Sequence, residues 1–340
     1  SKSTKSRSAR YSEDTEVPSF IGRKSVARPT AKRVEREEEQ VETPSSFAWR
    51  QFTDYCATAS MDERRQFGQF FTPAEVASFM ADMALPLRGD VRVLEPGAGT
   101  AILTSSLCER LPGRCTSVHI DVHEIHPKLA ELCEDVLRHT RDWLSSRGVS
   151  CTFAVHRGAF VLEKSAYLTP SLFNEAHELY DVAIANPPYF KLLKDDPRAR
   201  AASHIVHGQP NIYAIFMAIM ASLVRDNGVL VTITPRSFTT GDYFRRFREV
   251  LFSTMVPEML HLFGSRKDAF RKDEVLQENV IMRLAKKRTD ADTRVTISSS
   301  AGISDLVQRT IRTVPLRDVI DMDSRELAVH IPVNDVDNHV

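Results

Sequence analysis

The stretch YDVAIANPPYFK, from Tyr180 to Lys191, joins an apolar run to an amide, two prolines and an aromatic ring. The Asn186 side chain offers a carbonyl acceptor, and the restricted backbone of Pro187 holds a second one. Two acceptors suit a planar amino group. If both of its hydrogens are accepted, electron density concentrates on the nitrogen, which becomes a better nucleophile without a strong base. The ring of Tyr189 offers a face on which a planar substrate can stack.

A second group of residues suits a cofactor. In VRVLEPGAGTA, Glu95, Gly97 and Gly99 directly follow an apolar run and precede a helical pattern. Glycines at such a turn let the backbone approach a ligand and leave helix N-terminal amides available. Glu124 ends the next predicted strand, where its carboxylate can accept hydrogen bonds from ribose hydroxyls. The third glycine of the dinucleotide-binding form is absent, since alanine and isoleucine follow. The structural alternatives are a tight turn for the glycines and an exposed helix-start charge for Glu124.

The elements that position these residues follow from the hydrophobic pattern. Strands are predicted at 91–94, 118–122, 151–155, the run ending at Asn186, 228–235, 258–263 and 279–285. Helices are predicted from about Ile102, from about Pro127, over 212–224 and twice within 47–85. Thr72 before Pro73 is typical of a helix N-cap and first turn. Strands alternating with helices predict a doubly wound α/β fold with a mostly parallel sheet, which binds ligands at the carboxyl ends of its strands.

Composition limits the class of protein. The chain has 340 residues, 42% of them apolar, and can bury a large core. Lysine plus arginine balances aspartate plus glutamate at 45 each, so net charge decides nothing about nucleic acid. The five cysteines form no Cys-x-x-Cys pair, which argues against a zinc site, and no other metal site is expected. The longest apolar run is too short to span a bilayer and no signal peptide is visible, so a soluble protein of the cytoplasm is expected.

Three motifs together resemble one known family. GQFFTP, VLEPGAGTA and IANPPY, in this order, are similar to motifs of the gamma-class adenine-specific DNA methyltransferases of restriction-modification systems. QPNIYAIF and VTITPRSF follow at family-like positions, so the resemblance spans about residues 66–285. It implies a class I methyltransferase fold, Rossmann-like, with seven mostly parallel strands and N-terminal helices. It also implies S-adenosylmethionine as cofactor and double-stranded DNA, with the target adenine flipped out of the duplex.

The resemblance implies roles for single residues. Cofactor binding is expected of Phe71, Thr72, Pro73, Glu95, Gly97, Gly99, Glu124, Ile125, Ala159 and Asn186. Asn186, Pro187 and Tyr189 would hold the target adenine, with Tyr189 on one face of the base and Phe270 on the other. One position departs from the family. Its members carry an acidic residue in a Gly-Asp-Phe-like turn that binds the cofactor's adenine amino group, whereas this chain has Ala159. Either cofactor affinity is lower or another group compensates.

Basic residues that follow strands near the expected site are candidates for contacts with DNA phosphates. These are Arg236, Arg266, Lys267, Arg271 and Lys272, together with Arg245, Arg246 and Arg248. An ordinary solvated helix face is the alternative for the last three.

Other functions remain open. Related motifs serve methyltransferases that act on a glutamine side-chain amide or on an RNA base amine, and GQFFTP favours the DNA enzymes over them. A non-catalytic subunit that binds cofactor or DNA within a larger complex is an alternative of another class, against which the intact Asn-Pro-Pro-Tyr argues.

The chain divides into a disordered charged tail (1–45), a catalytic domain (46–288) and the incomplete start of a C-terminal target-recognition region (289–340). Only ~55 residues follow the catalytic motifs, against the ~100 typical of a domain. The sequence therefore predicts either a piece of a longer protein or an enzyme that relies on a specificity or restriction subunit. The expected role is the modification activity of a restriction-modification or phage-defence system in a bacterial cytoplasm.

Overall fold

The computed structural model describes residues 41–58, 60, 71–168, 179–206, 210–264 and 279–331. All of these belong to one compact unit, Val41–Val340. The charged tail predicted for residues 1–45 lies almost wholly outside the described residues. The first described helix begins at Pro44, slightly before the expected start of the catalytic domain.

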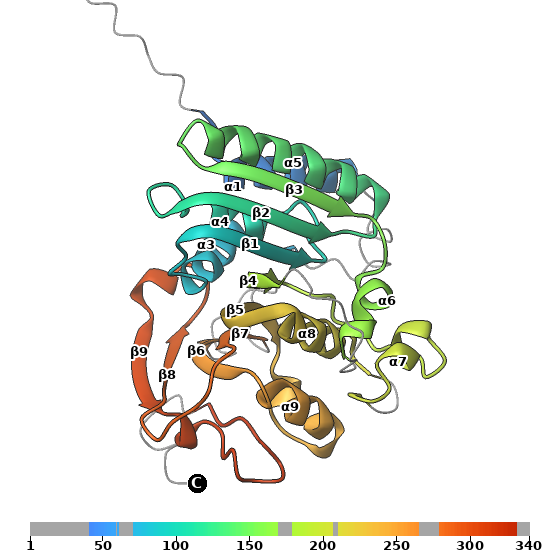
Figure 1. The fold of residues 1–340 in the computed structure, drawn as a ribbon, viewed down its shortest axis with the longest axis vertical. Coiled ribbons are helices and arrows are strands. Elements are labelled where there is room, and N and C mark those ends of the chain that lie inside the picture. The colour runs from blue at the N-terminus through green and yellow to red at the C-terminus, as the bar shows by residue number, and fades with distance from the viewer. Residues whose placement is uncertain are drawn as a thin grey trace, which may run out of the picture. The chain divides into compact units, whose positions relative to one another are not determined.

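One sheet runs through this unit, in the strand order β3-β2-β1-β4-β5-β7-β6-β8-β9 (Figure 1). The strands are β1 (Gly89–Pro96), β2 (Cys115–His123), β3 (Ser150–His156), β4 (Tyr180–Ala185), β5 (Val224–Pro235), β6 (Val256–Phe263), β7 (Asn279–Ala285), β8 (Arg294–Ser300) and β9 (Thr310–Pro315). The first five in chain order pair in parallel, and β7 runs antiparallel between β5 and β6. The predicted doubly wound class is confirmed, with nine described strands in place of the seven expected.

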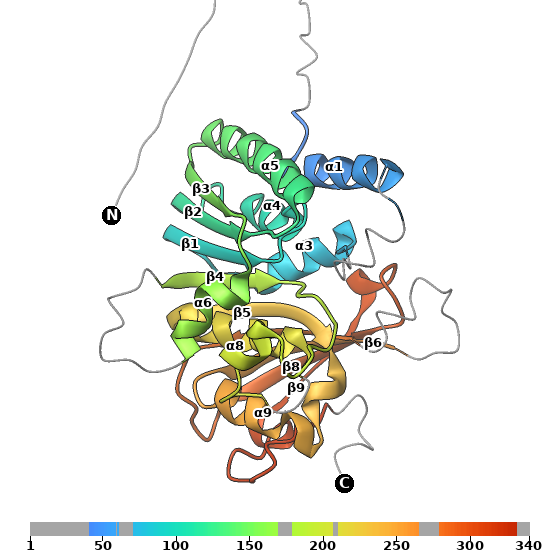
Figure 2. The same cartoon turned by 90° about the vertical axis from the view of Figure 1, so that its right-hand side faces the viewer.

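Helices cover both faces of the sheet (Figures 1 and 2). They are α1 (Pro44–Thr58), α3 (Ala74–Met83), α4 (Ile102–Cys108), α5 (Pro127–Ser145), α6 (Phe160–Lys164), α7 (Pro197–Ala201), α8 (Ile212–Leu223) and α9 (Arg245–Phe252). One apolar core lies between the sheet and α3, α4 and α5, and a second lies between the sheet and α6, α8 and α9. The result is a three-layer arrangement with the sheet in the middle.

Strand β4 shows why an apolar run was needed before the Asn-Pro-Pro-Tyr segment. All six of its residues are buried. Val182 and Ile184 point into one core, whereas Ala183 and Ala185 point into the other. From Val182 to Ala185 the strand carries only apolar side chains on both faces, as expected for the middle of a parallel sheet. The strand ends at Ala185, so Asn186 stands at the carboxyl edge of the sheet.

The start of α3 differs from the prediction. Pro73, and not Thr72, occupies the N-cap position, and no side chain caps the helix there. The Thr72 hydroxyl is instead bonded to Asn186, after β4. The Thr72 hydroxyl, which the local sequence pattern assigned to the helix N-cap, thus bonds to a residue far away in the chain.

The sheet extends beyond the expected end of the catalytic domain. Strand β8 pairs in parallel with β6, and β9 pairs antiparallel with β8. Residues after 288, which the sequence placed in a C-terminal region, thus continue the same sheet as far as Pro315. Whether a target-recognition region follows stays a prediction.

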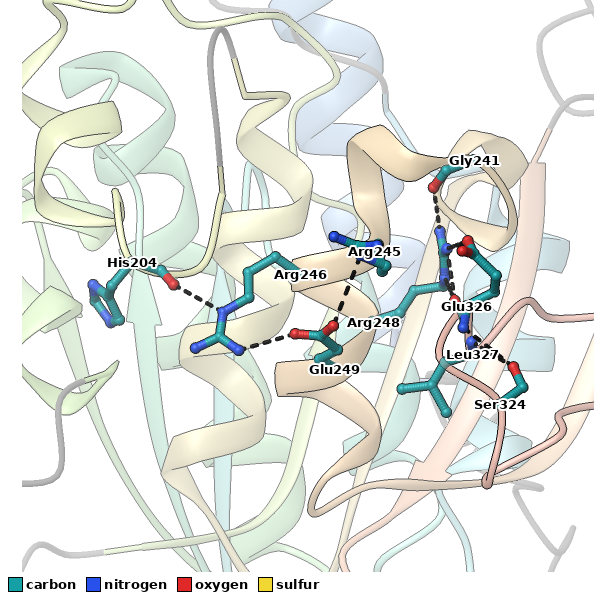
Figure 3. A network of polar contacts seen from close by, with 9 residues as sticks. All are labelled: His204, Gly241, Arg245, Arg246, Arg248, Glu249, Ser324, Glu326 and Leu327. Carbon is teal, nitrogen blue, oxygen red and sulfur yellow. Dashed lines mark hydrogen bonds and ion pairs between the residues drawn. The ribbon is translucent and has the colours of Figure 1, made fainter.

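Arg248 in α9 joins the segment around Glu326 to the turn after β5 (Figure 3). Its guanidinium is fully buried and donates hydrogen bonds to the backbone carbonyls of Phe238, Gly241 and Glu326, at 2.7 to 3.1 Å. A phosphate contact was one interpretation of this arginine. The structure contradicts it, because the buried guanidinium donates its hydrogen bonds to backbone carbonyls of the same chain. Its neighbour Arg246 pairs with Glu249 on the exposed side of the same helix.

Within the described part of the chain, no helix is both long and apolar enough to cross a membrane. Four of the five cysteines are buried and all five are free thiols. The four buried ones pack as small apolar side chains in the core.

Candidate active site

A cavity of about 390 Å³ opens where the carboxyl ends of β1, β2, β3 and β4 meet. The predicted cofactor residues that line it are Phe71, Thr72, Glu95, Gly97, Gly99, Glu124, Ile125, Ala159 and Asn186. The two sequence motifs, almost ninety residues apart, therefore border a single cavity. This is the place at which open α/β sheets bind their ligands.

The loop after β1 forms the floor of the cavity. Gly97 and Gly99 both have positive φ, 71° and 57°, a conformation that side chains disfavour. A Cβ at Gly99 would lie 3.6 Å from the Phe71 ring, so the loop and this ring approach closely. The Gly97 N–H donates to the His123 carbonyl at 2.7 Å, which ties the loop to the end of β2.

Glu124 is held by backbone amides on both of its oxygens. Its Oε2 accepts from the Gly99 N–H at 2.8 Å, and its Oε1 accepts from the His126 N–H at 2.8 Å. The carboxylate is only slightly exposed, and burial raises its pKa while the backbone hydrogen bonds oppose that rise. A carboxylate has about four lone-pair positions, so each oxygen can also accept a hydroxyl from a ligand in the cavity.

Glu95 plays a more structural part than its position in the loop suggested. Its Oε2 accepts from the Thr104 N–H, in the first turn of α4, at 2.9 Å. The side chain is 2% exposed, and burial raises its pKa to about 8. At neutral pH the group is therefore mostly protonated. It fixes the start of α4 against the cavity rather than presenting a charge to a ligand.

The Asn186 amide is bonded at both ends. Its Nδ2 donates to the Thr72 Oγ1 at 3.1 Å, and its Oδ1 accepts from the Tyr189 hydroxyl at 2.5 Å. The same hydroxyl is 2.8 Å from the Ile233 carbonyl, at the end of β5. Burial raises the pKa of Tyr189, so the hydroxyl stays protonated. An amide held this way can offer its oxygen to an amino group in the cavity.

Apolar side chains form the remaining walls. Ile125 is 55% exposed although it borders the cavity, which suits a residue that a flat ligand would cover. Phe160 in α6, Phe216 in α8 and Pro188 also line the cavity, and the two phenylalanine ring centroids are 5.0 Å apart. Ala159 lies at the N-cap of α6 and contributes no polar group there.

Sequence reasoning missed several residues of this cavity. They include His123, Phe160, Pro188, Phe190, Arg198 and Phe216. An aromatic residue directly after the third strand was a usable signal for Phe160. Phe216 carried none, because its helix reads as uniformly apolar. Arg198 is paired with Asp196 at 2.7 Å, and its guanidinium carbon lies 5.5 Å from the ring centre of Phe190.

Other predicted site residues lie elsewhere. Pro73, Pro187 and Tyr189 do not line the cavity, although Tyr189 reaches it through Asn186. Arg236 is exposed at the start of a 3-10 turn after β5, on the edge of the sheet where β4 ends. The remaining candidates, Arg266, Lys267, Phe270, Arg271 and Lys272, lie outside the described residues.

The fold and the cavity define a class I methyltransferase architecture. A Listeria monocytogenes protein assigned to the class I S-adenosylmethionine-dependent methyltransferases superimposes with a TM-score of 0.54, covering 77% of this chain and 75% of that one at 14% identity. At this level of identity the likeness concerns the fold alone.

Residues 152–270 match the family described as Eco57I restriction-modification methylase. The chain is 32% identical over 276 residues to the type II methyltransferase M.BsuBI of Bacillus subtilis, covering 80% of this chain and 53% of the relative. It is 30% identical over 285 residues to the type II methyltransferase M.PstI of Providencia stuartii, covering 82% of this chain and 55% of the relative. The predicted resemblance to restriction-modification methyltransferases is thereby confirmed. The chain spans about half the length of these two relatives.

Proposed function

We propose that this chain is the catalytic region of a DNA methyltransferase that transfers a methyl group from S-adenosylmethionine to the 6-amino group of adenine. One observation carries the proposal: Asn186 borders the same cavity as the glycine loop and Glu124. Asn186, which can hold an amino nitrogen, thus faces the same cavity as the glycine loop and Glu124, which can hold a nucleoside cofactor.

The cavity fits the cofactor in three respects. The Glu124 carboxylate is positioned to accept the ribose hydroxyls. Ile125, Phe160 and Phe216 form apolar walls for a flat adenine ring. The tight turn of the loop after β1, whose glycines carry no side chain, lets the remaining part of the cofactor approach the backbone. When bound, S-adenosylmethionine supplies an electrophilic methyl group.

The residues around Asn186 would align the target amino group with the methyl group of the cofactor. The Asn186 Oδ1 and the Pro187 carbonyl would accept the two hydrogens of the target amino group, which favours its nitrogen as nucleophile. No strong base is needed, because the proton can leave after the nitrogen has gained positive charge. Holding nitrogen and methyl in line is the main source of rate enhancement in this account.

Double-stranded DNA is the proposed substrate. The related type II methyltransferases and the Eco57I match favour a role in restriction-modification. The target base would leave the stack, at a cost of a few kcal/mol, and pack against Tyr189. Arg236, exposed on the edge of the sheet beside the cavity, is a candidate for a phosphate contact, and a specificity or restriction subunit is a candidate partner.

The test is incubation of the protein with methyl-labelled S-adenosylmethionine and mixed-sequence duplex DNA, followed by nucleoside analysis. Label in 6-methyladenine supports the proposal. Label in glutamine residues or in RNA supplied in parallel would replace it with the corresponding alternative. Absence of calorimetric heat for S-adenosylmethionine, with or without DNA, would point to a non-catalytic subunit.

A further inference from the structure

Thr72 and Asn186 meet although 114 residues separate them in the chain. Thr72 is 5% exposed and borders the cavity two residues before α3. Its hydroxyl does not cap that helix. It accepts a hydrogen bond from the Asn186 Nδ2 at 3.1 Å. The segment that precedes α3 therefore contacts the side chain that the proposed reaction depends on.

The Tyr189 hydroxyl lies on the other side of the Asn186 amide. It has one proton and two acceptors in reach, the Asn186 Oδ1 at 2.5 Å and the Ile233 carbonyl at 2.8 Å. An amino group that donates to Asn186 Oδ1 either shares this oxygen, which has two lone pairs, or displaces the Tyr189 donor. When the donor is displaced, the tyrosine proton has the Ile233 carbonyl as an acceptor.

During this exchange the amide loses its donor from Tyr189 and depends more on its other contacts. An asparagine amide that rotates about its last side-chain bond presents NH₂ in place of oxygen. Two NH₂ groups facing one another cannot form the required hydrogen bond. Because a hydroxyl both donates and accepts, the Thr72 hydroxyl restrains the position and plane of the amide, and the incoming amino group itself favours the orientation with the oxygen inward. A methyl group of the same size makes no hydrogen bond to the amide.

We propose that Thr72 is a positioning residue for methyl transfer: its hydroxyl restrains the Asn186 amide at the edge of the cavity, so that the amide oxygen meets the incoming amino group in line with the methyl donor. This inference rests on the proposed function and assigns to Thr72 a role beyond lining the cofactor cavity. It predicts a defect in the transfer step and not in cofactor affinity.

The experiment compares wild type, Thr72→Val and Thr72→Ser. Valine keeps the volume and removes the hydroxyl, and serine keeps the hydroxyl. Single-turnover methylation of duplex DNA at saturating S-adenosylmethionine should slow about tenfold in Thr72→Val, the loss expected for one net hydrogen bond. Thr72→Ser should restore the rate to within about threefold of wild type, and calorimetry should find cofactor affinity changed by less than about threefold in both variants.

Two results would overturn the inference. One is a Thr72→Val protein with wild-type rate and affinity. The other is a loss of cofactor affinity with an unchanged rate at saturation, which would assign the hydroxyl to the cofactor. Thr72→Ala provides the same comparison if the valine variant does not fold. A wild-type protein that methylates no DNA would instead count against the proposed function, so the two failures are distinguishable.

Discussion

The Glu124 Oε2 accepts a hydrogen bond from the Gly99 N–H at 2.8 Å, which joins the end of β2 to the loop after β1. The contact orients the carboxylate and fixes the glycine loop in one step. Because Oε1 accepts from the His126 N–H as well, backbone amides hold both oxygens of the carboxylate.

Glu124→Gln is expected to weaken S-adenosylmethionine binding by roughly 10- to 100-fold, because hydrogen bonds to a charged group contribute about 1.5–3 kcal/mol. Glutamine keeps the shape but replaces one acceptor oxygen with a donor. Calorimetric titration measures the change, and Glu131→Gln, on the exposed face of α5, is the matched control. Unchanged affinity in Glu124→Gln would remove Glu124 from the cofactor site.

Ala159→Asp is expected to tighten cofactor binding roughly tenfold, if its carboxylate accepts the adenine amino group at this wall of the cavity. Residue 159 is also the uncapped N-cap of α6, so the same change should raise the free energy of unfolding by about 1 kcal/mol. Ala159→Ser separates the two effects, since serine caps the helix without a charge. Equal affinities in the two variants would show that no amino group is recognised here.

Glu95 predicts a specific pH dependence of stability. Its folded-state pKa of about 8 lies above the ordinary 4.5, so the folded protein binds more protons than the unfolded chain between these two values. The free energy of unfolding should therefore fall as pH rises through this window, by up to about 1.4 kcal/mol per pH unit from this group. Glu95→Gln removes this titration. In urea denaturation, the free energy of unfolding of this variant should therefore rise relative to that of wild type as pH increases from 6 to 9. Parallel pH curves for the two proteins would contradict the assignment.

Arg248→Met should destabilise the fold by roughly 3 kcal/mol or more, since three backbone carbonyls lose a fully buried donor. Arg246→Met, two residues earlier in α9 and in a surface pair with Glu249, should change stability by less than about 1 kcal/mol. Chemical denaturation of both variants makes the comparison. Similar losses in the free energy of unfolding of the two variants would mean that the buried guanidinium contributes no more to stability than a surface arginine.

The core of the fold could be predicted because its signals are local. Apolar runs bounded by turns located the strands, and β4 ends beside Asn186 as its two prolines require. The glycine loop and Glu124 were found for the same reason, since each follows directly from a strand end.

The rest depends on packing between distant segments. No local signal could show that Thr72 would bond to Asn186, or that Phe216 would reach the cavity from α8. Arg248 was misread because it was grouped with Arg245 and Arg246, which lie on the less buried side of α9. The helical repeat did carry a hint, since Arg248 shares its buried face with Leu251 and Phe252.

The most direct test of the central claim is Asn186→Ala, assayed for 6-methyladenine in duplex DNA under saturating S-adenosylmethionine, with cofactor affinity measured in parallel. The account predicts a rate at least about 100-fold below wild type, because the amide that aligns the amino group is gone, while cofactor affinity changes by less than about tenfold. A variant that forms 6-methyladenine as fast as wild type would contradict it.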